Sequence, residues 1–255
     1  MTRKYAVVGS PISHSKSPII HRAIFKQLGV DAEYSAHEVT ELVEFLNAER
    51  DIAGLSLTMP LKDQAFRLAT ELDSWAERTG AVNTLLRTES GWSGFNTDVF
   101  GLQQASNSVK FETVTVLGTG ATARSALVAF HGAEVTLWGR NEDSATRLAE
   151  EFACRSAQLN EALSADLVVS TLPGDALLEL IPRQSVYPGT FLSASYAVGS
   201  NSSADNFNGF ISGLEMLMWQ AVGQGRIFTG IGPGSPMKDE EKLVEVLRVA
   251  LDMTK

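Results

Sequence analysis

Three clusters of polar side chains in the first hundred residues follow short apolar runs, which is where α/β proteins place their ligands. The first cluster is Ser13-His14-Ser15-Lys16-Ser17-Pro18. Hydroxyl groups at the start of a helix, supported by the helix dipole, suit a small carboxylate. Capping of the helix by Ser17 alone is the simpler structural explanation, but three serines and a lysine exceed what a cap needs.

The second cluster, Ser56-Leu57-Thr58-Met59-Pro60-Leu61-Lys62, presents a lysine at the predicted start of a helix. A cation is unfavourable there, because the N-terminal end of the helix dipole prefers anions. We therefore expect a functional role for Lys62. A solvated surface lysine is the alternative.

The third cluster consists of Gly80-Ala81-Val82-Asn83-Thr84 and Gly94-Phe95-Asn96-Thr97-Asp98. Both segments place amide and hydroxyl groups after short apolar runs, and Asp98 could form an ion pair with Lys62. Polar turn residues of this kind are often only Asx caps, which is the structural alternative.

A glycine-rich loop, Gly118-Thr119-Gly120-Ala121-Thr122-Ala123, follows the apolar run Val114–Leu117. A helix through His131 and a strand at Glu134–Trp138 are predicted beyond it, which makes one βαβ unit of the dinucleotide-binding kind. The glycines allow a tight turn and a close approach of the backbone to a pyrophosphate. A tight turn without a ligand is the alternative, since such loops are common.

The residues after the second strand of this unit indicate which dinucleotide is bound. An NAD site usually carries Asp or Glu there, whereas this chain has Gly139-Arg140-Asn141. Arg140 could pair with a 2′-phosphate and stack on adenine, which favours NADP. Glu142 and Asp143 follow directly and keep NAD as the alternative.

Strand-like and helix-like patterns alternate along the chain and predict an α/β fold. The expected strands are Lys4–Gly9, Glu33–Val39, Ile52–Met59, Ala81–Leu86, Trp92–Phe95, Val114–Leu117, Glu134–Trp138, Asp166–Thr171, Thr190–Ser195 and Asn208–Ile211. The expected helices include Pro18–Leu28, Glu41–Asn47, Lys62–Thr70 and Asp239–Leu251. For the first of these helices, Ser17 is the expected N-cap and Gly29 the expected C-cap.

Two lobes follow from this order of elements. We expect an N-terminal α/β substrate domain over residues 1–100, completed by C-terminal helices within 213–255. A Rossmann-type, doubly wound dinucleotide-binding domain is expected over residues 101–212.

Composition excludes several classes of function. The chain has 255 residues, 44% of them hydrophobic and 20% charged, which is ordinary for a soluble globular protein with a sizeable core. Its single cysteine, Cys154, forms no intramolecular disulfide, and its four histidines share no metal-ligand spacing, so we expect a reducing cytoplasm and no metal. The net charge of −9 disfavours binding to nucleic acid. The sequence has no apolar run of about 20 residues, so we expect no membrane partner.

Taken together, the motifs resemble the shikimate dehydrogenase family. The matching strings, in the family's order, are SPISHSKSP (10–18), SLTMPLK (56–62), GAVNT (80–84), FNTD (95–98), GTGATAR (118–124), GRN (139–141), STLP (170–173) and SGLEMLMWQ (212–220). The resemblance implies the reversible, NADPH-dependent reduction of 3-dehydroshikimate to shikimate in aromatic amino-acid biosynthesis. It leaves the oligomeric state open, with a homodimer as one option.

The resemblance also implies roles for individual residues. Lys62 and Asp98 match the catalytic pair, with Asp98 also on the substrate. The matching substrate-binding residues are Ser15 and Ser17 for the carboxylate and Thr58, Asn83 and Gln220 for the ring hydroxyls. The matching cofactor-binding residues are Gly118, Thr119, Gly120, Ala121, Thr122, Arg124, Arg140 and Asn141, with Gly213 and Met216 beside the nicotinamide.

This chain departs from the family pattern at several positions. Ser56 stands where many members carry Asn, and Ser144 replaces a second basic residue after Arg140. The segment Phe191–Ser203 has Ser193 in the place of an Asp and lacks the usual Pro-Thr-Pro. Two alternatives therefore stay open: an NAD-dependent quinate/shikimate dehydrogenase, and a catalytically weak homologue that binds shikimate as a sensor.

Overall fold

The computed structural model describes residues 2–174, 176–196 and 202–253. Its internal contacts divide the chain into two compact units, Met1–Phe100 with Met218–Lys255 (unit 1) and Gly101–Leu217 (unit 2). One boundary between the units falls within helix α5 (Thr97–Ala105), and the other falls within helix α9 (Gly213–Phe228). Within the described residues, no helix has the length and apolar character needed to cross a membrane.

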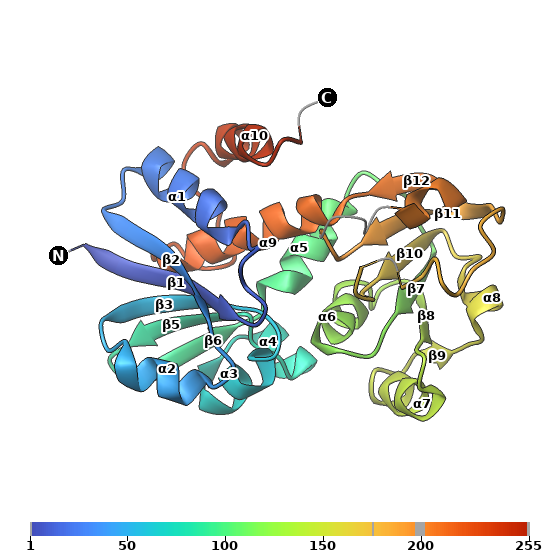
Figure 1. Ribbon diagram of the computed structural model, residues 1–255, viewed down its shortest axis with the longest axis horizontal. Helices are drawn as coiled ribbons and strands as arrows, with labels where there is room; N and C mark the ends of the chain where they lie inside the picture. The colour runs from blue at the N-terminus through green and yellow to red at the C-terminus, as the bar shows by residue number, and fades with distance from the viewer. Residues whose placement is uncertain (1, 175, 197–201, 254–255) are drawn as a thin grey trace. The chain divides into compact units, whose positions relative to one another are not determined.

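Unit 1 is built on a mixed six-stranded sheet in the order β2-β1-β3-β5-β6-β4 (Figure 1). Its strands are β1 (Arg3–Gly9), β2 (Ala32–Glu38), β3 (Ile52–Leu57), β4 (Glu71–Leu72), β5 (Thr84–Thr88) and β6 (Gly91–Phe95). Strand β1 pairs in parallel with β2 and β3, whereas β5 is antiparallel to both β3 and β6. The carboxyl ends of β1, β3 and β6 and the amino end of β5 therefore lie along one edge of the sheet.

Helices cover both faces of this sheet because side chains alternate along its strands. Ala6 and Val8 of β1 face a core that includes residues of α2 (Leu42–Ala48), α3 (Lys62–Leu68) and α4 (Ser74–Thr79). On the opposite face, the Tyr5 ring packs on Phe25 of α1 (Ser17–Leu28) and Phe228 of α9. Helix α10 (Glu240–Ala250) packs against α1 (Figure 1).

Unit 2 contains a second six-stranded sheet, in the order β12-β11-β10-β7-β8-β9, in which every pairing is parallel. Its strands are β7 (Thr113–Leu117), β8 (Glu134–Trp138), β9 (Arg155–Ser156), β10 (Leu167–Ser170), β11 (Tyr187–Ser193) and β12 (Phe207–Ile211). Counted within the unit, this is the 3-2-1-4-5-6 order of a Rossmann fold. The predicted doubly wound sheet is confirmed.

The remaining elements of unit 2 connect these strands. They are α6 (Ala121–Ala129), α7 (Glu142–Glu151), the single turn α8 (Leu159–Ala162) and the 3₁₀ helix η1 (Ser202–Asn206). Helix α6 was expected to extend through His131 but ends at Ala129. Residues 197–201 of the atypical segment Phe191–Ser203 lie outside the described part of the chain.

The expected N-cap of α1 is wrong. Lys16 is the N-cap, with helical backbone angles (φ −87°, ψ −4°), and Ser17 is already the first helical residue and is buried. The helical conformation thus begins one residue earlier than the serine pattern predicted, and the Ser17 amide donates instead to the hydroxyl of Ser15 at 3.4 Å. The expected C-cap is confirmed, since Gly29 adopts a left-handed conformation (φ 65°).

The strand expected at Ala81–Leu86 begins later, at Thr84. Helix α4 ends at Gly80 (φ 65°), and the next residues are held by side-chain bonds rather than by the sheet. The Ala81 amide donates to the hydroxyl of Thr79, and the Ala81 carbonyl accepts from the Asn96 amide group. The polar residue types of the third cluster therefore form a connection that precedes the strand.

His21 is buried within unit 1. Its ring stacks on Tyr34 with centroids 4.3 Å apart, and its Nε2 lies 3.0 Å from Oε1 of Gln224. Its Nδ1 has no hydrogen-bond partner among the described residues. Burial lowers the pKa of His21 from its ordinary value of 6.5 to about 4, because the charged ring loses its hydration.

The low pKa of His21 predicts a loss of stability in acid. The folded protein favours the neutral ring, so this contribution is complete above pH 6.5 and is lost as the pH falls towards 4. Over that range we expect His21 to cost about 3 kcal/mol of unfolding free energy, at about 1.4 kcal/mol per unit. Urea unfolding between pH 4 and 8 should show a shallower pH dependence for His21→Gln than for the wild type. The exposed His14→Gln is the control, and equal slopes for all three proteins would contradict this account.

Candidate active site

Lys62 and Asp98 form an ion pair at the carboxyl edge of the unit 1 sheet. Lys62 is the first residue of α3, Asp98 lies in the first turn of α5, and Nζ of Lys62 donates to Oδ2 of Asp98. The two side chains are only 14% and 6% exposed. The ion pair expected from the sequence is therefore formed, and it is largely shielded from water.

The loop between β3 and α3 positions Lys62. The end of β3 and the first loop residue remain bonded to neighbouring segments, since the Leu57 amide donates to the Asn83 carbonyl (2.7 Å) and the Thr58 amide to the Val8 carbonyl (3.0 Å). Leu61, next to the lysine, is fully buried in the core of unit 1. The loop is thus anchored at both of its ends, which fixes the point at which Lys62 begins α3.

Asp98 is held by amide groups on its other side. Its Oδ1 accepts from Nδ2 of Asn83 at 2.7 Å, and its backbone amide donates to Oδ1 of Asn96 at 3.1 Å. Asn96 is itself fixed, because its Nδ2 donates to the hydroxyl of Thr79 and the carbonyl of Ala81. Both carboxylate oxygens thus have donors, as a buried charge requires.

Asn83 connects this pair to α9. Its Oδ1 accepts from the Thr84 hydroxyl (2.8 Å) and the Thr97 amide (2.9 Å), which leaves Nδ2 to face Asp98 and Oε1 of Gln220 (3.4 Å). Lys62, Asn83, Asp98 and Gln220 were all predicted as site residues from the sequence. The structure brings these four together within unit 1.

Ser15, Ser17 and Thr58 lie on segments that leave the same edge of the sheet. Thr58 follows β3, and the two serines follow β1. The strand ends are close, because a side chain at Gly9 would collide with Cγ2 of Thr58. Ser15 and Thr58 are partly exposed, whereas Ser17 is buried. The described hydrogen bonds do not link these three residues to the Lys62–Asp98 pair.

The glycine-rich loop of unit 2 connects β7 to α6. Gly118 has φ +119°, and a side chain there would collide with the hydroxyl of Thr171, which donates to the Leu117 carbonyl at 2.8 Å. Gly120 is the N-cap of α6, and a Cβ placed on it would meet no atom within 4 Å. The loop is therefore packed on its inner side and open at the end of the helix where backbone amides receive an anion.

Arg140, Asn141 and Arg124 have different environments. Arg140 is exposed at the end of β8. Asn141 caps α7 through its side-chain oxygen, which accepts from the Ser144 amide at 2.8 Å. The Arg124 guanidinium forms two hydrogen bonds with Glu151, one of them 2.9 Å long, and lies 5.0 Å from the centre of the Phe152 ring.

The start of α9 packs closely against the end of β11. A side chain at Gly213 would collide with the Ser195 carbonyl, and Met216 is buried. Ser193, which takes the place of an Asp in the family that the sequence resembles, donates its hydroxyl to the Ser195 carbonyl at 2.9 Å. The serine thus holds the backbone against which α9 begins.

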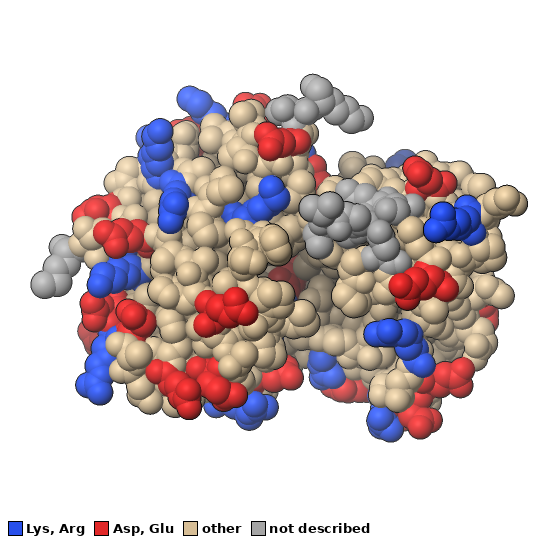
Figure 2. Space-filling view, viewed as in Figure 1, with Lys and Arg blue, Asp and Glu red and all other residues tan. Residues whose placement is uncertain are grey.

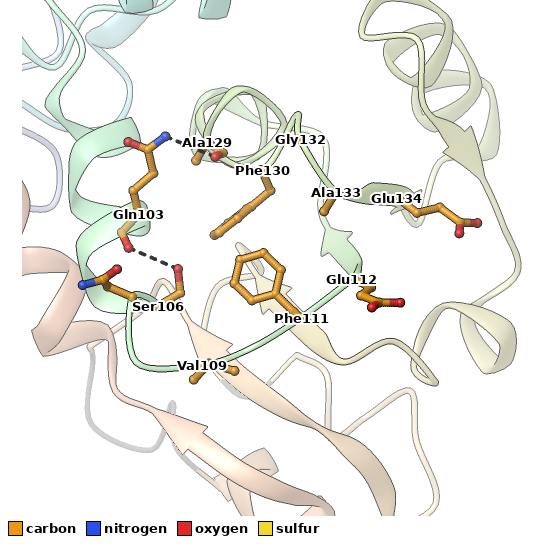
Figure 3. Close-up of a pocket in the computed structure, with 11 residues that line it drawn as sticks. Gln103, Ser106, Val109, Phe111, Glu112, Ala129, Phe130, Gly132, Ala133 and Glu134 are labelled. Atoms are coloured by element: carbon orange, nitrogen blue, oxygen red, sulfur yellow. Dashed lines mark hydrogen bonds between the residues drawn. The ribbon is translucent and has the colours of Figure 1, made fainter.

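A pocket that the sequence did not indicate lies on unit 2 (Figure 3), with a volume of about 500 Å³. Phe111 and Phe130 meet edge to face at its centre. It is lined by the end of α5, the approach to β7 and the residues after α6: Gln103, Ser106, Asn107, Val109, Phe111, Glu112, Ala129, Phe130, Gly132, Ala133 and Glu134. Since it borders the amino ends of β7 and β8, it lies away from the glycine-rich loop at the carboxyl end of β7.

Charged side chains are intermixed on the face of the molecule shown in Figure 2, where lysine and arginine alternate with aspartate and glutamate. Within the described residues, no group of three or more His, Cys, Asp or Glu side chains is placed to hold a metal ion.

Sequence reasoning missed one residue of the buried polar cluster, Gln224. It lies one helical turn after Gln220 in α9 and is 1% exposed. A glutamine four residues after another, on a helix face otherwise rich in apolar side chains, was the available signal.

Comparisons with known proteins agree with this architecture. A Rossmann-type sheet with a glycine-rich loop first defines the class, that of the dinucleotide-binding proteins. Residues 7–85 match the family described as shikimate dehydrogenase substrate binding domain. The shikimate dehydrogenase (NADP(+)) of Hyphomonas neptunium is 38% identical over 91% of this chain and 94% of its own length. The chain belongs to the shikimate dehydrogenase family.

Solved structures are similar over nearly the whole chain. Shikimate 5-dehydrogenase from Thermus thermophilus, in complex with NADP(H) and shikimate, has a TM-score of 0.80 at 30% identity and covers 97% of this chain and 99% of its own. Shikimate dehydrogenase from Mycobacterium tuberculosis has a TM-score of 0.83 at 32% identity, with 99% and 100% covered.

The buried ion pair makes a prediction about stability. Lys62→Met leaves the Asp98 carboxylate without its counter-ion, so we expect it to lower the unfolding free energy by about 3–5 kcal/mol. Adding Asp98→Asn should recover part of that loss. Urea unfolding of the two single variants and the double variant measures the coupling. The exposed pair Lys4–Asp51 (side chains 47% and 73% exposed) is the matched control and should show little coupling, because water screens it. Equal coupling in both pairs would contradict the buried geometry.

Proposed function

We propose that this chain is an NADP-dependent shikimate dehydrogenase that catalyses the reversible reduction of 3-dehydroshikimate to shikimate. The observation that carries the proposal is the shielded Lys62–Asp98 pair, held by Asn83 at the carboxyl edge of the unit 1 sheet. Support comes from relatives named shikimate dehydrogenase (NADP(+)) and from a similar structure solved with NADP(H) and shikimate.

The lysine suits the chemistry of ketone reduction. Negative charge develops on the carbonyl oxygen as the ketone is reduced, and the Lys62 ammonium stabilises that oxygen and protonates it. In the reverse direction the Lys62 amine takes the proton of the alcohol. Asp98 keeps the lysine in place and accepts a hydrogen bond from the same hydroxyl. When bound, the dinucleotide supplies or accepts the hydride.

Hydroxyl and amide groups around the pair would hold the substrate. In our proposal Ser15 and Ser17 bind the carboxylate, since they lie at the N-terminal end of the twelve-residue helix α1, whose dipole favours an anion. Thr58, Asn83 and Gln220 bind the ring hydroxyls. Residues 1–100 and 213–255 would form this substrate domain.

The residues of unit 2 fit NADP. The open end of α6 at Gly120 suits a pyrophosphate, and the loop residues Gly118–Thr122 would hold it. Arg140 would bind the 2′-phosphate, because it is exposed and forms no ion pair with the described residues. Arg124 would contribute less, because Glu151 already matches its charge. Asn141 completes the proposed cofactor site within residues 101–212. Gly213 and Met216 would add to it from the first turn of α9, and no metal is needed.

The proposal extends to location and partners. We place the enzyme in the cytoplasm, with small-molecule ligands and without a nucleic-acid or membrane partner. A homodimer is compatible with this proposal.

The cofactor choice is tested by assaying shikimate oxidation with NADP and NAD side by side. We expect a higher kcat/KM with NADP, and Arg140→Ala should lower it about 10- to 100-fold with NADP only, as for loss of a charge-assisted phosphate contact. Arg147→Ala, which removes an exposed arginine from α7, is the matched control. Faster turnover with NAD would favour the NAD-dependent alternative, and shikimate binding without turnover would favour the sensor.

The role of Lys62 is tested by Lys62→Ala. We expect kcat to fall about 10²- to 10⁴-fold with KM for shikimate changed only a few-fold, because the lysine acts on the oxygen at which charge develops. Steady-state kinetics of the folded variant measure both constants, with the exposed Lys26→Ala as the control. A large rise in KM at unchanged kcat would refute the assigned role.

A further inference from the structure

Gln224 of α9 is bonded to residues of the candidate site and forms four side-chain hydrogen bonds. Two of its partners, Asn83 and Thr84, belong to the polar cluster around Asp98. The other two, Ser56 and His21, lie on the opposite side of its amide. The sequence motifs assigned no role to this residue.

Its partners fix the orientation of the Gln224 amide. Nε2 donates to the backbone carbonyl of Asn83 at 3.1 Å, and a carbonyl is an acceptor only, so the nitrogen must face it. The oxygen Oε1 therefore faces the Ser56 hydroxyl at 2.7 Å and Nε2 of His21 at 3.0 Å, and both must donate to it. His21 accordingly carries its proton on Nε2.

This orientation determines where the Thr84 proton points. Thr84 Oγ1 accepts from Nε2 of Gln224 at 3.0 Å, so its own O–H donates to Oδ1 of Asn83 at 2.8 Å. Asn83 Oδ1 is thereby held as an acceptor, and Nδ2 is left to donate to Oδ1 of Asp98 at 2.7 Å. A flipped Asn83 amide would instead bring its oxygen against the carboxylate and push it away from Lys62.

We propose that Gln224 is a positioning residue for the reaction: it orients Asn83 through Thr84 and so keeps Asp98 against Lys62. It touches neither substrate nor cofactor in this scheme. The Thr97 amide also donates to Oδ1 of Asn83, at 2.9 Å, so loss of Gln224 weakens the orientation without abolishing it. The catalytic part of this inference rests on the proposed function.

Three variants separate positioning from packing. Gln224→Met keeps the length of the side chain and removes both donors, and Thr84→Val keeps the β-branched shape while removing the hydroxyl. Ser56→Ala is the matched control, since it removes a hydrogen bond to Gln224 Oε1 and leaves both amide donors in place. Unfolding curves give the folded fraction of each variant, by which kcat for shikimate oxidation is corrected.

We expect kcat of the folded enzyme to fall about tenfold in Gln224→Met and in Thr84→Val, and to stay within twofold in Ser56→Ala. The double variant should be no slower than Gln224→Met alone, because both changes break the same chain of hydrogen bonds. Wild-type kcat in either single variant, an additive double variant, or a loss in Ser56→Ala equal to that in Gln224→Met would overturn the proposal. Thr84→Val carries the test where Gln224→Met does not fold.

A second measurement does not depend on activity. The coupling between Lys62→Met and Asp98→Asn in urea unfolding should shrink by more than half in the Gln224→Met background, as it should in the Thr84→Val background, which removes the next hydrogen bond of the same chain. Undiminished coupling would overturn the positioning role. A wild-type chain that oxidises no shikimate would overturn the proposed function instead, and the coupling experiment then decides the role of Gln224 alone.

Discussion

The requirement that a buried charge be matched inside the protein organises unit 1. The Asp98 carboxylate is 6% exposed and needs donors for both oxygens, which it obtains from Lys62 and Asn83. Those donors come from the segments after β3 and before β5, so the carboxylate connects parts of the chain far apart in sequence. Loss of either connection removes a donor from the buried carboxylate.

The pairing of the strands brings the segments that carry Lys62, Asn83 and Asp98 together. Because β1 and β3 are parallel while β5 runs against β3 and β6, segments that follow three strands and precede a fourth meet along one edge. Helix α9 then adds Gln220 and Gln224 from the far end of the chain. Lys62 and its carboxylate partner thus lie on short, anchored connections, which favours a preorganised site over one that must be ordered by its ligand.

Local sequence patterns predicted much of the fold and of the candidate site, whereas contacts between residues far apart in sequence determined the remaining features. The Rossmann-type domain was predicted from an apolar strand, a glycine-rich loop and a helix in sequence. A functional role for Lys62 was predicted because a cation is unfavourable at the start of a helix, and Asp98, which follows another apolar run, was named as its possible partner. The N-cap of α1 was predicted at Ser17, but the backbone already has helical angles at Lys16, so Lys16 is the N-cap. The polar contacts of Gln224 join residues more than a hundred positions away, which no periodicity reveals.

The two arginines of the proposed nucleotide site have the same charge, but their surroundings differ in whether the guanidinium is available to bind a phosphate. Arg124 lies in the glycine-rich motif, yet Glu151 and the Phe152 ring occupy its guanidinium. Arg140 is exposed at the end of β8, so it meets an incoming phosphate without first losing a protein partner among the described residues. Breaking an existing ion pair costs part of what the new one gains. In the proposed site, a preference for the 2′-phosphate would therefore depend on Arg140, although both arginines carry the same charge in a chain of net charge −9.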